Sequence, residues 1–86
     1  MARKSSRSAG SSEVAWATRL GSELRARRKL LRLTQEELAV LAGCGPDFLY
    51  DLERGKPTVR LDKLVPVLDV LGLELKVGPR GPATNE

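Results

Sequence analysis

The chain contains no histidine and only one cysteine, Cys44, and these absences exclude several kinds of site. A single cysteine cannot form a disulfide within the chain, and without histidine there is no Cys/His set for a structural zinc ion. Histidine is also the commonest general base and the usual partner of nucleophilic serine or cysteine. No Gly-x-x-x-x-Gly-Lys motif for phosphate binding is present either. We therefore expect a protein that is not an enzyme and holds no metal or cofactor.

Aromatic residues and long apolar runs are also scarce, with one Trp, one Tyr and one Phe among 86 residues. A core built from Leu, Val and Ala favours helices, because strands recruit aromatic and β-branched residues. No apolar run approaches the ~18–20 residues that span a bilayer, and no signal peptide is evident. We expect one small cytoplasmic domain without a membrane partner, and a core of this size favours oligomerisation as added support.

Positive charge is concentrated in the first part of the chain. Residues 1–32 contain nine basic and two acidic residues and carry a net charge of +7, whereas the whole chain carries +4. A sequence pI of about 9.7 with such an asymmetry is typical of a nucleic-acid-binding protein. A soluble surface with a basic bias is the alternative interpretation.

The two ends of the chain differ in composition from its middle. Residues 1–12 are rich in Ser and basic side chains and contain no large apolar residue, so we expect a disordered basic arm. Such an arm either lies in a minor groove of DNA or remains solvated. Residues 78–86 begin with two Gly and two Pro among five positions, which predicts a disordered tail. The folded unit is then about residues 13–77.

Apolar spacing and capping signals predict four helices in this unit. The first covers about residues 14–32, with Leu20, Leu24 and Leu31 on its buried face and Gly21 as a weak point. The second covers about residues 35–42, between the capping box of Thr34 and Glu37 and the cap residue Gly43. The third begins at Pro46 and ends before Gly55, and the fourth covers residues 61–71, where Pro66 should kink or restart it.

Residues 73–77, Leu-Glu-Leu-Lys-Val, alternate strictly between apolar and polar, which predicts a half-buried strand. No second strand is predicted in this chain, so the strand must pair elsewhere. The simplest partner is the same strand of a second subunit, although pairing with another protein stays open. The candidate dimerisation residues are Leu73, Leu75 and Val77.

Two short helices joined by a tight turn with glycine, which follow a basic helix along the chain, form the helix-turn-helix arrangement. Residues 33–39, 42–43 and 52–56 resemble, in this order, the Cro/C1-type (Xre) family. With residues 61–64 and 68–75 included, the sequence resembles the HipB-type antitoxin branch. The resemblance implies an all-α, lambda-repressor-like bundle of four to five helices, with a short C-terminal β-strand that pairs across a dimer.

The resemblance also implies roles for individual residues. Gln35 matches a residue that contacts phosphates or bases, and Arg28 and Glu53 match a structural ion pair between the first and third helices. The third helix corresponds to the recognition helix, and nearby cations would contact phosphates. The candidate DNA-binding residues are Arg25, Arg27, Gln35, Gly45, Pro46, Asp47, Phe48, Tyr50, Asp51, Arg54, Lys56 and Arg60.

The recognition-helix positions depart from the family pattern because they are acidic and aromatic. Asp47 and Asp51 repel phosphates and can only accept hydrogen bonds, for instance from cytosine N4. Asp47 could instead serve only the helix dipole. Phe48 would either touch a thymine methyl group or pack in the core, and Tyr50 would either bond a phosphate or pack.

These observations predict a homodimeric, sequence-specific transcriptional repressor that binds an inverted-repeat operator on double-stranded DNA. The resemblance adds that it would be the antitoxin of a HipBA-like operon, with a HipA-like serine/threonine kinase as partner, and associated with the bacterial nucleoid when DNA-bound. The alternative is a protein-interaction module on the same scaffold, which sequesters a partner with little DNA readout.

Overall fold

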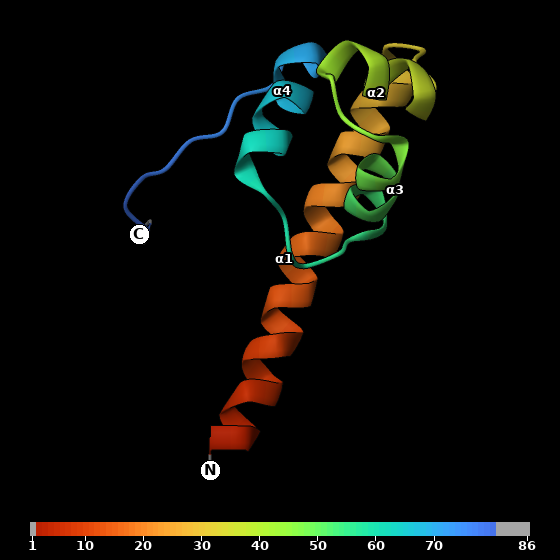
Figure 1. Ribbon diagram of the computed structural model, residues 1–86. Helices are drawn as coiled ribbons and strands as arrows, with labels where there is room; N and C mark the ends of the chain where they lie inside the picture. The colour runs from red at the N-terminus through yellow and green to blue at the C-terminus, as the bar shows by residue number, and fades with distance from the viewer. Residues whose placement is uncertain (1, 81–86) are drawn as a thin grey trace.

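The computed structural model describes the backbone of residues 2–80 and the side chains of residues 15–80. It contains four helices, which are α1 (Ala2–Leu30), α2 (Gln35–Ala42), α3 (Pro46–Arg54) and α4 (Leu61–Leu71). The second half of α1 lies against the other three helices, while its first half projects from the bundle (Figure 1). The part of the chain described is all-helical, as the composition predicts.

Local signals in the sequence determine where α2, α3 and α4 end. The Thr34 hydroxyl accepts the Glu37 amide at 3.0 Å, and the Glu37 carboxylate accepts the Thr34 amide at 2.8 Å, so the predicted capping box is confirmed. Gly43, Gly55 and Gly72 close the three helices with φ values of 70°, 90° and 72°. Glycine suits these positions because a side chain disfavours positive φ.

The core contains no aromatic residue that is fully buried. Its leucine and valine side chains come from all four helices, and α1 packs mainly against α3 while α2 packs against α4. Burial of these side chains is the main stabilising contribution to the bundle. The largest buried members are Leu24, Leu38, Leu49, Leu52, Leu64, Val67, Leu68 and Leu71.

The backbones of α1 and α3 approach closely at Gly21. A Cβ atom on Gly21 would lie 2.5 Å from the Leu52 carbonyl oxygen and 2.6 Å from that of Glu53. On the same side, a Cβ on Gly55 would lie 3.0 Å from Thr18. Gly21 is therefore the crossing point of the two helices, and not only the weak point that the sequence predicts.

The first and fourth helices differ from the prediction. Helix α1 begins at Ala2, whereas the sequence predicts a disordered arm over residues 1–12. Residues 2–12 contain no proline, so the helix can continue through them. Extending a helix that has already formed adds one hydrogen bond per residue and does not require a new nucleus. Side chains of residues 1–14 lie outside the described part, so the boundaries 1–12, 13–77 and 78–86 stay predictions. Helix α4 continues through Pro66 to Leu71 without restarting.

The predicted strand at residues 73–77 is not present: this segment has no regular secondary structure, and the described residues contain no strand. The physical reason is that a strand needs a neighbour to accept and donate its backbone hydrogen bonds, and the single chain offers none. The segment leaves the end of α4 as an extended tail (Figure 1).

No helix in the described part of the chain combines the length and apolar character required to cross a membrane.

Candidate nucleic-acid interface

One face of α3 is directed away from the core. Leu49 and Leu52 are buried on its inner side, at 0% and 3% exposure. The outer side carries residues spaced at i, i+3, i+4 and i+7, which places them on one face of a helix. We call this face the α3 stripe, and it consists of Asp47, Tyr50, Asp51 and Arg54.

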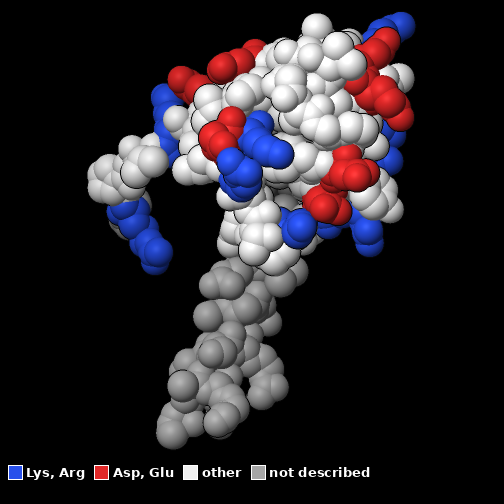
Figure 2. All heavy atoms as spheres, viewed as in Figure 1, with Lys and Arg blue, Asp and Glu red and all other residues white. Residues whose placement is uncertain are grey.

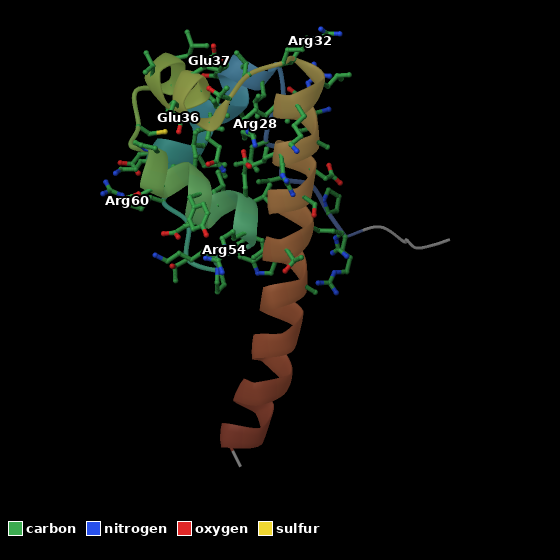
Figure 3. All side chains as sticks on the ribbon, turned by 90° about the vertical axis from the view of Figure 1, so that its right-hand side faces the viewer. Arg28, Arg32, Glu36, Glu37, Arg54 and Arg60 are labelled. Carbon is green, nitrogen blue, oxygen red and sulfur yellow. The ribbon has the colours of Figure 1, made fainter. Side chains whose placement is uncertain are left out.

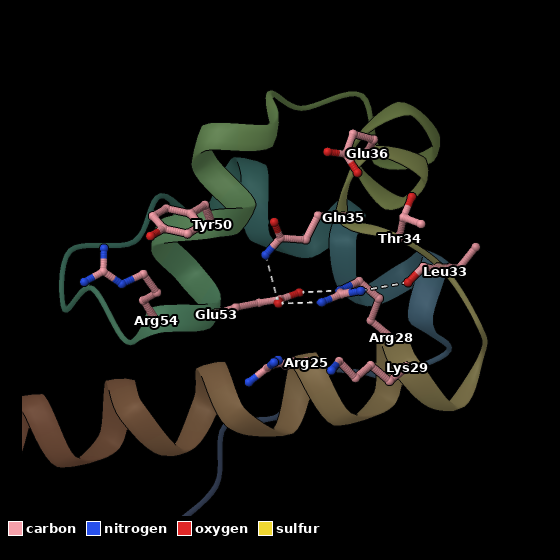
Figure 4. A pocket seen from close by; sticks show the side chains of 10 residues that line it. All are labelled: Arg25, Arg28, Lys29, Leu33, Thr34, Gln35, Glu36, Tyr50, Glu53 and Arg54. Carbon is pink, nitrogen blue, oxygen red and sulfur yellow. Dashed lines mark hydrogen bonds and ion pairs between the residues drawn. The ribbon is translucent and has the colours of Figure 1, made fainter.

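A hollow of about 470 Å³ lies beside the α3 stripe, where α1, the start of α2, and α3 meet (Figure 4). Cations from two helices line it, Arg25 and Lys29 from α1 and Arg54 from α3, and they outnumber the exposed carboxylate of Glu36. Gln35, the first residue of α2, also lines it. Several cations around an open hollow provide a surface that attracts phosphates.

The inner wall of this hollow is formed by the buried pair of Arg28 and Glu53. The guanidinium donates to the carboxylate through Nε at 2.7 Å and Nη2 at 2.9 Å, and through Nη1 to the Leu33 carbonyl at 2.8 Å. The side chains are only 9% and 4% exposed. Arg28 lies between α1 and the other helices (Figure 3). The structure thus brings together the two residues that the resemblance pairs, with the bidentate geometry that arginine and carboxylate favour.

Gln35 is joined to the same pair, because its Nε2 donates to Glu53 Oε1 at 3.1 Å. Burial by itself raises the pKa of Glu53, but hydrogen bonds from Arg28 and Gln35, with the charges of Arg28 and Arg25, outweigh it and lower the pKa below its ordinary value. The hydrogen bond to Glu53 raises the pKa of Arg28. Both groups are therefore charged at neutral pH.

We predict that the Glu53 pair makes stability depend on pH in the acid range. Because its folded-state pKa is lowered, the carboxylate stabilises the fold above its ordinary pKa of 4.5, and this contribution is lost as the pH falls toward the folded value. The melting temperature of the wild type should therefore fall between about pH 5 and pH 3. In Glu53→Gln this fall should be shallower than in the exposed control Glu74→Gln, and equal slopes in the two variants would contradict the prediction.

Several other charged residues in or near α3 contact neighbouring side chains. The Arg54 guanidinium lies 5.0 Å from the centre of the Tyr50 ring, and Lys56 Nζ lies 3.5 Å from Asp51 Oδ2. Arg60 pairs with Asp62 at 2.6 Å, and its hydrogen bond lowers the pKa of Asp62. On the face seen in Figure 2, basic and acidic side chains are interspersed.

A helix-turn-helix domain model matches residues 19–76, which is more than half of the chain. The chain belongs to this helix-turn-helix domain family. It is also similar to the uncharacterized HTH-type transcriptional regulator y4mF of Sinorhizobium fredii, with 43% identity over 58 residues that cover 67% of this chain and 76% of that protein. Helices α2 and α3, joined by the turn at residues 43–45, are the two helices of the motif.

Two candidate DNA-binding residues of the helix-turn-helix domain do not lie on this surface. Arg27 lies about 200° around α1 from Arg25 and therefore faces away from the hollow. Its Nε donates to the Leu71 carbonyl at 2.8 Å, so the side chain caps the end of α4. Phe48 packs against the core, with Lys63 Nζ 5.9 Å from its ring centre. This corrects the prediction for Arg27 and supports the core alternative for Phe48.

The remaining candidates lie on or near α3. Gly45 and Pro46 are exposed at its N-terminus, and Arg54 and Arg60 lie on the outside of the domain (Figure 3). The sequence prediction missed Lys29, which lines the hollow; its spacing of four residues from Arg25 is the signal that places both on one face of α1.

The three candidate dimerisation residues are in different environments. Leu73 packs against the core of its own chain, and its amide donates to the Leu68 carbonyl at 2.9 Å. Leu75 and Val77 are 52% and 97% exposed. Glu74 Oε2 and Lys76 Nζ lie 3.6 Å apart, so these side chains share the opposite side of the tail.

Proposed function

We propose that this chain is a sequence-specific DNA-binding transcriptional repressor that acts as a homodimer on an inverted-repeat operator. The observation that carries the proposal is the α3 stripe next to the hollow surrounded by Arg25, Lys29 and Arg54. In a helix-turn-helix protein the second helix enters the major groove, while flanking cations hold the phosphates. The relative from Sinorhizobium fredii, which is named a transcriptional regulator, supports a role in transcriptional regulation.

Removing one cation at the hollow should weaken binding without changing sequence preference. We expect Arg54→Ala to bind a promoter fragment from its own gene more weakly and to reduce the salt slope by about 1, because one phosphate contact is lost. Fluorescence anisotropy at several salt concentrations measures both. Arg80→Ala removes the same charge from the exposed C-terminal segment and should leave the slope unchanged.

Binding that prefers the promoter over an unrelated fragment and weakens with salt is the result expected of a repressor. An unchanged salt slope in Arg54→Ala would show that Arg54 at the hollow does not contact DNA. Equal, weak binding to both fragments would contradict the proposed repressor function and favour the second candidate function, a protein-interaction module.

The exposed tail is the proposed dimer contact. Within the described part of the chain, residues 74–77 make no backbone hydrogen bond, and Leu75 and Val77 expose apolar side chains on one side. Antiparallel pairing of two such tails around a two-fold axis satisfies the backbone and covers these side chains. Two recognition helices then reach successive major grooves about one helical turn apart, and the operator is an inverted repeat.

We predict that Leu75→Lys breaks this dimer and lowers the melting temperature, because a charge replaces an apolar side chain at the contact. Analytical ultracentrifugation measures the dimer. Glu74→Lys introduces the same residue on the other side of the tail and should leave the dimer intact. A Leu75→Lys protein that remains dimeric would contradict the proposed contact. A monomeric wild type would contradict it too, and would favour pairing of the tail with another protein.

We further propose, from the resemblance to the HipB-type branch, that the chain is an antitoxin that represses its own operon and binds a HipA-like serine/threonine kinase. Co-expression of the chain with a kinase encoded beside its gene tests this role. A stable complex that shifts in size-exclusion chromatography is expected, and two separate peaks would contradict it.

A protein-interaction module is the second candidate function. It is favoured by the two carboxylates of the α3 stripe and by Val40 and Leu41 on the outer side of α2, which are 80% and 61% exposed. Exposed apolar side chains near one another are typical of a protein contact. Such a contact would depend little on salt, in contrast to DNA binding.

A further inference from the structure

We propose that Asp47 is the base-reading residue of the α3 stripe and that it accepts a hydrogen bond from the N4 amino group of a cytosine in the major groove. This inference rests on the proposed function, because it states which base the same surface selects. It follows from which of the two stripe carboxylates has no basic partner, from the shape of the end of α3, and from the donors that bases present.

Of the two carboxylates of the α3 stripe, Asp51 has a charged partner, and the other two stripe residues contact each other through a ring face. Lys56 lies 3.5 Å from the Asp51 carboxylate, and Arg54 is placed over the Tyr50 ring at 5.0 Å. Asp47 is exposed, and none of the ion pairs among the described residues includes it. It is also the stripe residue closest to the N-terminus of α3, the end of a recognition helix that contacts base edges.

The end of α3 allows this short side chain to reach a base. Gly45 has no side chain and open space around its Cα, and Pro46 occupies the first helical position. No long side chain of these two residues therefore separates Asp47 from the groove. The carboxylate oxygens of an aspartate lie only three bonds beyond its Cα, so a close approach of the helix end is a condition for contact with a base.

The chemistry of the carboxylate favours cytosine. An ionised carboxylate only accepts hydrogen bonds, and the donors in the major groove are cytosine N4 and adenine N6. Adenine presents the N7 acceptor beside its amino group, which repels the second carboxylate oxygen. Cytosine presents a C–H group there instead. Asparagine, which donates and accepts, matches the adenine edge.

This difference defines the experiment. The full chain and Asp47→Asn are each used to select from a random-sequence duplex DNA library at two salt concentrations. Asp69→Asn, an exposed aspartate on α4, makes the same charge change away from α3. Circular dichroism confirms that the variants fold. In the wild type we expect about tenfold preference for cytosine at one position of each half-site.

The Asp47→Asn variant should lose this preference and favour adenine at that position, while the rest of the motif is retained. It should also bind unrelated DNA more tightly, because a negative charge near the phosphates is removed. Asp69→Asn should select the wild-type motif. As a chemical probe, N4-methylcytosine at the selected position should weaken the wild type about tenfold and leave Asp47→Asn unaffected.

The outcomes separate the two proposals. The same base preference in the wild type and in Asp47→Asn would overturn the role of Asp47 while DNA recognition stands. A wild type that selects no motif at either salt concentration would overturn sequence-specific binding, and the role of Asp47 with it.

Discussion

Glu53→Met should cost the helix-turn-helix domain about 3–5 kcal/mol of unfolding free energy, because it leaves the Arg28 guanidinium buried without its partner. A domain of this size has a free energy of unfolding of about 5–10 kcal/mol, so much of this stability would be lost. The pair is bidentate, and its side chains are 9% and 4% exposed, so water cannot replace the carboxylate without rearrangement. Denaturation by urea at neutral pH measures the change.

The double variant Arg28→Met/Glu53→Met is the matched control. It removes the unpaired charge and leaves apolar side chains of similar length, so we expect it to recover most of the lost stability. The Leu33 carbonyl then loses the bond from Arg28, which accounts for a residual loss of about 1 kcal/mol. If the double variant were as unstable as Glu53→Met, the unpaired charge would not be the cause.

Gly21→Ala should destabilise the domain by about 2–3 kcal/mol, although alanine is the better helix former. The new methyl group would meet the carbonyl oxygens of Leu52 and Glu53 at 2.5 and 2.6 Å. These are backbone atoms of α3, so the two helices must separate to admit it. Thermal unfolding should show a loss of about 8–24 °C, using the usual relation for domains of this size.

Gly45→Ala provides the control for Gly21→Ala. Gly45 has φ −81° and no atom within 4 Å of an added Cβ, but it is the N-cap of α3, where glycine is preferred to alanine, so we expect a loss of at most about 1 kcal/mol. A Gly21→Ala protein with the melting temperature of the wild type would show that α1 and α3 do not cross closely at this point.

Local features of the fold were predictable from the sequence. The capping box of Thr34 and Glu37 and the glycines that close α2, α3 and α4 depend on residues within a few positions of one another. Leu31 shows where this reasoning ends. Its spacing predicts a buried position, but α1 stops at Leu30 and Arg32 adopts φ 61°, which leaves Leu31 41% exposed.

Features that depend on how helices meet were not predictable from spacing. Arg27 belongs to the same basic run as Arg25, yet it caps α4, because only the packed bundle brings the Leu71 carbonyl within its reach. The crossing at Gly21 likewise needs the position of α3. The contact of Arg28 with Glu53 spans 25 residues, and only the resemblance to a known family suggested it.

The hydrogen bond from Gln35 to Glu53 also bears on the entropy of DNA binding. A free glutamine side chain samples many rotamers, and fixing it on a ligand opposes association by about 0.5–1.5 kcal/mol. Here Nε2 is already held at 3.1 Å by a carboxylate that is itself fixed by Arg28. The side chain is thus ordered when the domain folds, and a phosphate or base that meets it does so with little further loss of conformational freedom.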